Sequence, residues 1–305
     1  MVTSTASTSP NRLTLWLALT SVYILWGSTY LFIHFMTEHM PPLYMASIRF
    51  LVAGTLLYFY ARLTGTARPS REQVVSAGAI GVLLLTIANG CLAMALQYIP
   101  TGVAALITST LPIFLLTLNW VSFGKTRPSN LALGGLLLGL TGIFFLIKPD
   151  NFQGVGSANA SLIGAGFIMI GNTSWAIGTL LSPRLALPAQ IMSSGIQMLA
   201  GGIVLMLISF CIEPVSLDTI TVAPPKALGA LLYLVLFGSI IGFSSYSWLA
   251  RNASPQLLST YAYVNPVVAM MLGALFAGES LSPSSLIGAG IVVAGVVLIT
   301  LGRNR

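Results

Sequence analysis

Charged residues are scarce in this chain: Asp, Glu, Lys and Arg together make up only 6% of its 305 residues. An ordinary soluble domain carries about 25% charged residues, so the chain as a whole is not a soluble enzyme or a soluble binding module. Only two cysteines and two histidines occur, which is too few for a disulfide framework or a zinc site. Neither a resident metal nor another cofactor is predicted.

Signals for nucleic-acid binding and for common enzyme chemistry are also missing. Basic residues outnumber acidic ones by 13 to 6, but they stand singly between apolar runs and form no stripe that a nucleic acid could follow. No nucleophile elbow, paired cysteines or acid dyad occurs in the sequence. The stretch Gly124-Lys125-Thr126 ends like a phosphate loop, but Asn119 stands where that loop needs its first glycine. The sequence therefore predicts neither an enzyme nor a nucleic-acid partner.

Long apolar runs, in contrast, fill the chain, and apolar residues make up 56% of it. A helix that spans a bilayer needs about 20 mainly apolar residues, and ten such segments follow one another with short connections. They are Leu13–Phe35, Leu43–Leu63, Val74–Gln97, Thr101–Phe123, Asn130–Ile147, Ala158–Leu180, Ala189–Ile212, Lys226–Leu249, Pro255–Ala277 and Pro283–Leu301. The sequence predicts an all-α polytopic membrane protein with ten transmembrane helices, preceded by a disordered cytoplasmic tail at residues 1–12.

The charges at the segment ends predict how the chain is oriented. When the segments alternate sides, one set of ends and loops holds ten cations and the other holds only Lys148 and Lys226. Cytoplasmic loops carry the excess of Lys and Arg in membrane proteins. The cation-rich set and both termini are therefore predicted to face the cytoplasm.

The two halves of the chain resemble each other. Trp26 matches Trp175, and Pro112 matches Pro266, which lies 154 residues later. Each half holds five segments, an odd number, so the second half must cross the membrane in the opposite sense. The sequence predicts two inverted five-helix repeats, residues 13–148 and 158–301, arranged around a central cavity as in many transporters.

Two prolines interrupt the fourth and ninth segments. A proline inside a helix frees the carbonyl four residues earlier, here those of Thr108 and Ala262. In lipid, such an oxygen needs a partner from the protein or from a water-lined cavity. A plain kink at a helix crossing is the alternative for either proline alone. At matching positions, Pro112 and Pro266 predict hinges or kinks beside a binding cavity.

Arg49 is the one cation well inside a predicted span. An intramembrane charge marks a functional site by default. The alternative is a structural role, in which the guanidinium reaches outward or braces helix ends through carbonyls, Glu38 or Glu279. Both roles stay open. The carboxylates lie at the edges of the spans, so any coupling to protons is expected at the outer rim, through Glu38, Glu279 or His34.

Uncharged polar and aromatic residues interrupt several of the apolar segments. The candidates for substrate binding are Trp26, Ser28, Thr29, Asn89, Trp175, Tyr261 and Asn265. Such side chains suit an uncharged or zwitterionic ligand with an apolar part. Each could instead be packing glue between helices or part of an interfacial aromatic belt. The glycine pairs Gly135/Gly139 and Gly238/Gly242 fit tight helix contacts within the fold as well as a homodimer.

Four stretches together resemble the EamA family of the drug/metabolite transporter superfamily, and the layout is most similar to its YedA-like bacterial inner-membrane branch. They are Trp26-Gly27-Ser28-Thr29-Tyr30, Arg49–Gly54, Pro112-Ile113-Phe114 and Tyr261–Pro266. The resemblance covers nearly the whole chain after residue 12. It implies ten helices in two inverted repeats, a central cavity and alternating access. One departure is Lys125, where the first repeat of the family often has an acid after glycine.

The predicted function is transport: export of small amphipathic metabolites, such as amino acids or related compounds, across the bacterial inner membrane. The expected mode is uniport, exchange, or transport coupled to protons at the outer rim. A narrower alternative is a phosphorylated-sugar or nucleotide-sugar exchanger of the same superfamily, but such a dianion would need several deep cations. An intramembrane lipid enzyme and a non-transporting receptor or scaffold are the alternatives of a different class. The predicted partners are a small molecule and the lipid bilayer.

Overall fold

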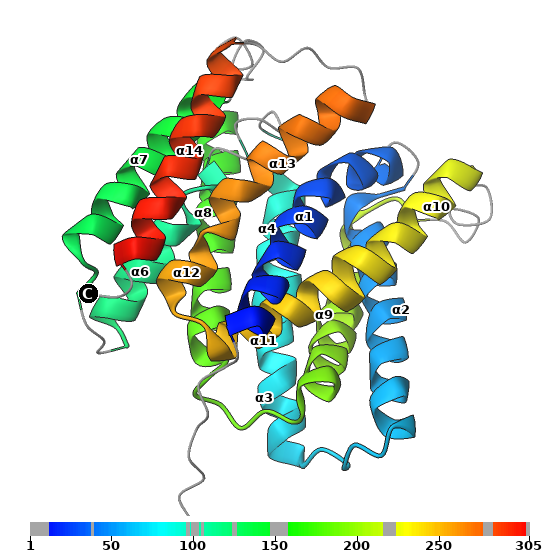
Figure 1. Cartoon of the computed structure of the whole chain (residues 1–305). Helices are drawn as coiled ribbons and strands as arrows, with labels where there is room; N and C mark the ends of the chain where they lie inside the picture. Colours follow the sequence, from blue (N-terminus) through cyan, green and yellow to red (C-terminus); the bar gives the residue numbers. More distant parts are fainter. Residues whose placement is uncertain are drawn as a thin grey trace, which may run out of the picture.

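The chain folds into helices throughout the part that the structure describes. This computed structural model describes residues 12–37, 40–95, 98, 104, 107–123, 127–146, 158–215, 224–276 and 283–302. No strand occurs among these residues, and the helices form one bundle (Figure 1). The all-helical prediction is confirmed for them.

Four of the five predicted segments of the first half match helices closely, and the fourth, Thr101–Phe123, is the exception. Their bounds are α1 Arg12–Thr37, α2 Pro42–Leu63, α3 Arg71–Gly81, η1 Val82–Ile87, α4 Ala88–Ala95, α6 Leu111–Val121 and α7 Asn130–Leu146. The elements α3, η1 and α4 form one continuous helix of 25 residues, with a π-helical stretch in its middle. This helix begins at a capping box in which Ser70 and Gln73 each accept a hydrogen bond from the backbone of the other.

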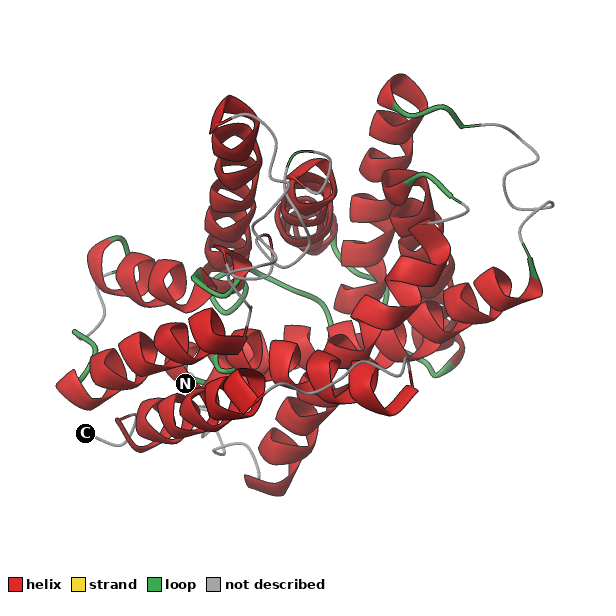
Figure 2. Ribbon diagram, turned by 90° about the horizontal axis from the view of Figure 1, so that it is seen from above, coloured by secondary structure: helices red, strands yellow, loops and turns green. Residues whose placement is uncertain are grey.

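The helices of the second half repeat this pattern. Their bounds are α8 Ala158–Leu181, α9 Gln190–Ile212, α10 Pro225–Tyr233, η4 Leu234–Phe243, α11 Ser244–Asn252, α12 Pro255–Ser259, α13 Tyr261–Phe276 and α14 Pro283–Gly302. The elements α10, η4 and α11 again form one long helix, of 28 residues, and again its middle part is π-helical. Figure 2 shows the helices from one end of the bundle.

Five of these helices are long and apolar enough to cross a bilayer, counted over the described residues. They are Pro42–Leu63, Arg71–Ala95, Leu162–Leu181, Gln190–Ile212 and Pro225–Asn252. Shorter apolar helices accompany them, and large apolar side chains cover their outer faces, among them Leu63, Leu162 and Leu275. A soluble monomer rarely exposes apolar surface on this scale. The chain is therefore a polytopic membrane protein.

Small residues bring pairs of helices into close contact. The helix α7 runs beside α14 (Figure 1), and a Cβ added to Gly135 would lie 2.7 Å from the carbonyl oxygen of Gly295. Between α2 and α9, a Cβ on Gly54 would lie 2.8 Å from the backbone nitrogen of Leu199. Backbones can approach this closely only where no side chain intervenes. Gly135 therefore serves a contact within the fold, one of the two uses expected of its glycine pair.

The fourth predicted segment differs from the prediction at Pro112. The chain turns at Ser109 and Thr110, and α6 begins at Leu111. Pro112 therefore stands in the first turn of a helix, where its missing N–H removes no hydrogen bond. Pro266 does lie inside α13, as predicted, but the ninth segment is also divided, at Thr260 between α12 and α13. Both segments are interrupted, as predicted. The fourth has a break before Pro112 where a kink at Pro112 was predicted, and the ninth has a break at Thr260 as well as Pro266 inside its helix.

Candidate functional site

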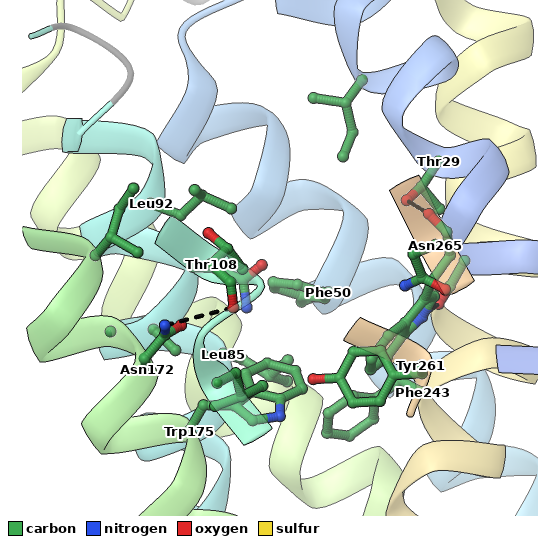
Figure 3. A pocket seen from close by; sticks show the side chains of 18 of the residues that line it. Thr29, Phe50, Leu85, Leu92, Thr108, Asn172, Trp175, Phe243, Tyr261 and Asn265 are labelled. Atoms are coloured by element: carbon green, nitrogen blue, oxygen red, sulfur yellow. Dashed lines mark hydrogen bonds between the residues drawn. The ribbon is translucent and has the colours of Figure 1, made fainter. Parts of the chain in front are cut away.

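A cavity of about 170 Å³ lies in the middle of the bundle, between helices from both halves of the chain (Figure 3). A single water needs only about 10–15 Å³ of such space, so the cavity has room for a small molecule. Its lining includes six of the seven predicted binding residues, namely Trp26, Thr29, Asn89, Trp175, Tyr261 and Asn265. The structure brings these six together from α1, α4, α8 and α13, and their role in binding stays a prediction.

Ser28 is the predicted binding residue that does not line the cavity. Its Oγ donates to the carbonyl oxygen of Leu25 at 2.8 Å and lies 2.7 Å from the hydroxyl of Tyr233. Ser28 is thus engaged in packing α1 against α10, whereas its neighbour Thr29 faces the cavity. Successive residues on a helix point about 100° apart, which separates the two side chains.

Two polar lining residues, Thr108 and Asn172, were not among the predicted seven. Asn172 lies three residues before Trp175, so the two share one face of α8. The spacing from Trp175 was the signal that could have identified Asn172. For Thr108 the sequence had singled out the carbonyl and not the side chain, whose hydroxyl is buried without a hydrogen-bond partner.

Four aromatic side chains close the cavity toward the start of α1, and we call them the aromatic floor: Trp26, Trp175, Tyr246 and Tyr261. Trp26 stacks on Tyr246 with 5.0 Å between ring centroids, and it meets Trp175 and Tyr261 edge-on at 5.7 and 5.3 Å. The indole nitrogen of Trp175 donates to the Tyr246 hydroxyl at 2.5 Å. Trp175 and Tyr261 lie near each other at one end of the cavity in Figure 3. Tyr246 and Tyr261 belong to the main core, which also includes Leu19 nearer the start of α1, and Trp26 and Trp175 pack against it.

The two carbonyls that the prolines were predicted to free are both hydrogen-bonded by side chains. Asn172 Nδ2 donates to the carbonyl oxygens of Ile107 and Thr108 at 3.2 and 3.4 Å. Ser109 Oγ donates to the carbonyl oxygen of Ala262 at 3.4 Å. A side chain of α8 thus donates to the carbonyls at the break before α6. A side chain at that break in turn donates to a carbonyl of the proline-containing helix α13. Protein side chains satisfy the irregular backbone, as they must at membrane depth.

The π-helical stretches also present carbonyls to side chains around the cavity. Trp26 Nε1 donates to the carbonyl oxygen of Gly238 in η4 at 3.0 Å. In η1, the carbonyl of Leu83 accepts from Ser174 Oγ at 2.9 Å, and that of Leu84 accepts from Asn89 Nδ2 at 2.9 Å. Short π-helical stretches inside α-helices frequently mark functional sites. Here they place carbonyls and amides beside the same cavity.

Arg49 also lines the cavity, and only 9% of its surface is exposed. Its Nε donates to Ser239 Oγ at 2.6 Å, and its guanidinium carbon lies 5.2 Å from the ring centroid of Phe50. Glu38 and Glu279 are the two acids that were predicted to brace Arg49 or to couple protons. Both lie outside the described residues. For His34 the structure describes the helix but not the side chain.

Known proteins similar to this chain point to transport. The EamA-like transporter family matches residues 12–148 and 162–301. The uncharacterized inner membrane transporter YedA of Escherichia coli (strain K12) is 41% identical over 288 residues, which cover 94% of this chain and 90% of YedA. A chloroplastic WAT1-related protein of Arabidopsis thaliana is 29% identical, covering 95% of this chain and 70% of that protein.

A solved crystal structure has the same fold. It superimposes with a TM-score of 0.79, covering 95% of this chain and 98% of the other, at 19% sequence identity. This likeness shows the fold alone. The family match covers most of the sequence, and the relatives that define it are transporters and not enzymes. The chain therefore belongs to the EamA-like transporter family.

Proposed function

We propose that this protein is a secondary transporter that exports small amphipathic metabolites, amino acids or related compounds, across the bacterial inner membrane by alternating access. Membership of a transporter family supports the transport step. The observation that carries the proposal is the cavity, whose lining combines aromatic rings with amides and hydroxyls at interrupted helices. Binding sites in transporters are commonly built from such interrupted helices near the middle of the bilayer.

The proposal includes ten spans in two inverted repeats, residues 13–148 and 158–301, and paired contacts support it. Trp26 of the first predicted span donates to η4 in the eighth. In the second half, Ser174 of the sixth span donates to η1 in the third. The second span packs on the seventh, as α2 on α9, and the fifth on the tenth, as α7 on α14. An inverted repeat produces such reciprocal pairs because each half contacts the other in the same way.

Alternating access assigns a role to the aromatic floor. The positive-inside rule places the start of α1, and with it both termini, on the cytoplasmic side. The floor, which packs into the main core, is then the closed cytoplasmic barrier. Loading from the cytoplasm requires the floor to part. The proposed hinges are the break before Leu111, next to Pro112, and the segment of α12 and α13 that holds the break at Thr260 and the kink at Pro266.

Counterflow in proteoliposomes tests the proposal. Vesicles with the purified protein, preloaded with one unlabelled amino acid, should accumulate the same labelled compound faster than protein-free vesicles. Asn89→Ala, which alters the cavity lining, should lower the rate at least several-fold. Thr141→Ala is the matched control, because Thr141 is exposed on α7 and its hydroxyl bonds only to its own helix at Leu137. Ligand binding without any flux would show a receptor and refute the carrier.

The driving force is a separate part of the proposal. Uniport, exchange or proton coupling at the outer rim is expected, because no acid occurs among the described residues that line the cavity. A protonophore should leave counterflow intact. If net flux depends on the proton gradient, replacing Glu38, Glu279 and His34 together should abolish that dependence. Gradient-dependent flux that survives the triple substitution would contradict the assignment.

A further inference from the structure

The guanidinium of Arg49 has donors that no protein group uses. Of its five N–H groups, the one on Nε bonds to Ser239. Within the described residues no other hydrogen bond or ion pair reaches this side chain. The two terminal nitrogens, with four N–H groups, are therefore unpartnered on a residue that is nine-tenths buried and lines the cavity.

The part of the cavity lining that the structure describes also holds no negative group to balance this charge. No Asp or Glu stands among the lining residues that the structure describes, and Arg49 is the one charged residue in that set. A cation inside a membrane protein is costly unless a counter-charge or water compensates it. Removing a cation from water is repaid only by close, well-oriented partners. The site is thus electrostatically incomplete without an anion.

The local structure holds the guanidinium in a fixed orientation. Ser239 anchors Nε at 2.6 Å, and the ring of Phe50 lies against the guanidinium. A Cβ at position 238 would approach the terminal nitrogen Nη2 to 2.8 Å, so a side chain there would displace the guanidinium from its place beside η4. A guanidinium fixed in this way presents its paired N–H groups to a planar carboxylate, which it binds through two parallel hydrogen bonds.

Aromatic and aliphatic groups surround this charge. The carbonyl of Gly238, beside the guanidinium, also accepts the indole N–H of Trp26 from the aromatic floor. Phe50, Leu85 and Phe243 add apolar lining (Figure 3). A ligand whose carboxylate meets Arg49 would therefore lay its other end against rings and aliphatic side chains.

We infer that the cavity selects organic monoanions, in which Arg49 binds one carboxylate and the aromatic floor receives an apolar or aromatic body. This inference deepens the proposed function and rests on it for the transport step. It also has a consequence for amino acids. Because no acid lines the described cavity to meet an ammonium group, the α-ammonium should contribute little. A single cation likewise disfavours dianions such as phosphate monoesters.

Binding of matched compounds to the purified protein in lipid nanodiscs tests the inference. The probes share one phenyl-propyl body and differ in the end group: 3-phenylpropanoate, 3-phenylpropanamide, 3-phenylpropylamine and 3-phenylpropyl phosphate, with phenylalanine as the zwitterion. We expect the carboxylate to bind at least tenfold more tightly than the amide, the amine and the phosphate. Phenylalanine should bind no more than about threefold more tightly than 3-phenylpropanoate, the margin that one weak hydrogen bond would give.

Substitutions of Arg49 provide the second arm. Arg49→Gln should bring the carboxylate and amide affinities within threefold of each other. Arg49→Lys should keep the preference but weaken it, since an ammonium group cannot form the bidentate pair. Arg62→Gln is the matched control on the same helix, because Arg62 lies outside the cavity and bonds to the carbonyl of Thr66. If Arg49→Gln does not fold, Ser239→Ala replaces it and should lower carboxylate affinity several-fold without changing amide affinity.

The outcomes separate this inference from the proposed function. A carboxylate preference that persists in Arg49→Gln, equal binding of the amide or amine to the wild-type protein, or no binding of any carboxylate at millimolar concentration would each overturn the anion site. If amides or amines are transported in proteoliposomes and Arg49→Gln does not slow them, the carrier stands and the anion site falls. Carboxylate binding of the expected pattern without flux would leave the anion site in place and refute the carrier.

Discussion

Replacing Asn172 with alanine removes the amide that joins α8 to the break before α6. Its Nδ2 lies 3.2 Å from the carbonyl oxygen of Ile107, 3.4 Å from that of Thr108 and 3.3 Å from the hydroxyl of Thr110. The side chain is 5% exposed. In the variant the carbonyl of Thr108 loses the donor described for it, whereas the carbonyl of Ile107 keeps the backbone N–H and the hydroxyl of Thr110, at 3.0 and 2.6 Å.

The expected loss follows from the cost of an unsatisfied buried acceptor, which is about 1–3 kcal/mol. One NH2 group has two N–H donors, so no more than two of the three contacts form strong bonds at one time. Thr108 lines the cavity, so water can reach its carbonyl and offset part of the cost. We therefore expect the free energy of unfolding to fall by about 1–2 kcal/mol.

Equilibrium unfolding in mixed micelles of graded dodecyl sulfate content measures this free energy directly. Thr173→Ala is the control on the next residue, because Thr173 is only half-buried and its hydroxyl bonds to its own helix at Met169. That control should change stability by less than about 0.5 kcal/mol. Asn172→Asp should be at least as damaging as Asn172→Ala, since an ionised carboxylate is only an acceptor. Equal stability of Asn172→Ala and Thr173→Ala would refute the reasoning.

Two further predictions use the same unfolding measurement. Glu213→Ala should cost about 1–3 kcal/mol, because this carboxylate accepts from the backbone nitrogens of Leu43 and Tyr44, at 2.9 Å each, where α2 begins. Glu72→Ala at an exposed first-turn position is its control, and equal losses would contradict the capping role. Gly54→Ala should destabilise by about 1–3 kcal/mol through overpacking against α9. Gly134→Ala, where no atom lies within 4 Å of the added Cβ, should be neutral or stabilising, and a loss of the same size there would refute the packing argument.

The sequence predicted the long helices well because the bilayer dictates their length. The predicted segment Leu43–Leu63 is α2 at Pro42–Leu63, and Ala189–Ile212 is α9 at Gln190–Ile212. The π-helical stretches were beyond reach of this reasoning. Their carbonyls bond to Ser174 and Trp26, which lie 91 and 212 residues away in the chain from their partners. A local apolar pattern carries no information about such partners.

The candidate site was predictable where spacing decides the face of a helix. Tyr261 and Asn265 are four residues apart, so they had to share a face, and both line the cavity. The predicted repeat was less informative for Arg49. In that prediction Gln197 corresponds to Arg49, but Gln197 is fully buried and its amide nitrogen donates to Ser193 within its own helix at 2.9 Å. The two side chains thus differ in environment, because Arg49 lines the cavity and Gln197 does not.

The hydrogen bonds around the cavity constrain how the bundle can move. Backbone irregularities persist in lipid only where side chains or water satisfy their polar groups. Here the donors come from other helices: Asn172 to the break before α6, Ser174 to η1 and Trp26 to η4. Any motion that parts these helices breaks such bonds at the cavity wall, where water or a ligand can replace them. A substrate that supplies the missing partners would lower the cost of opening, so binding and movement are expected to be coupled through these few carbonyls.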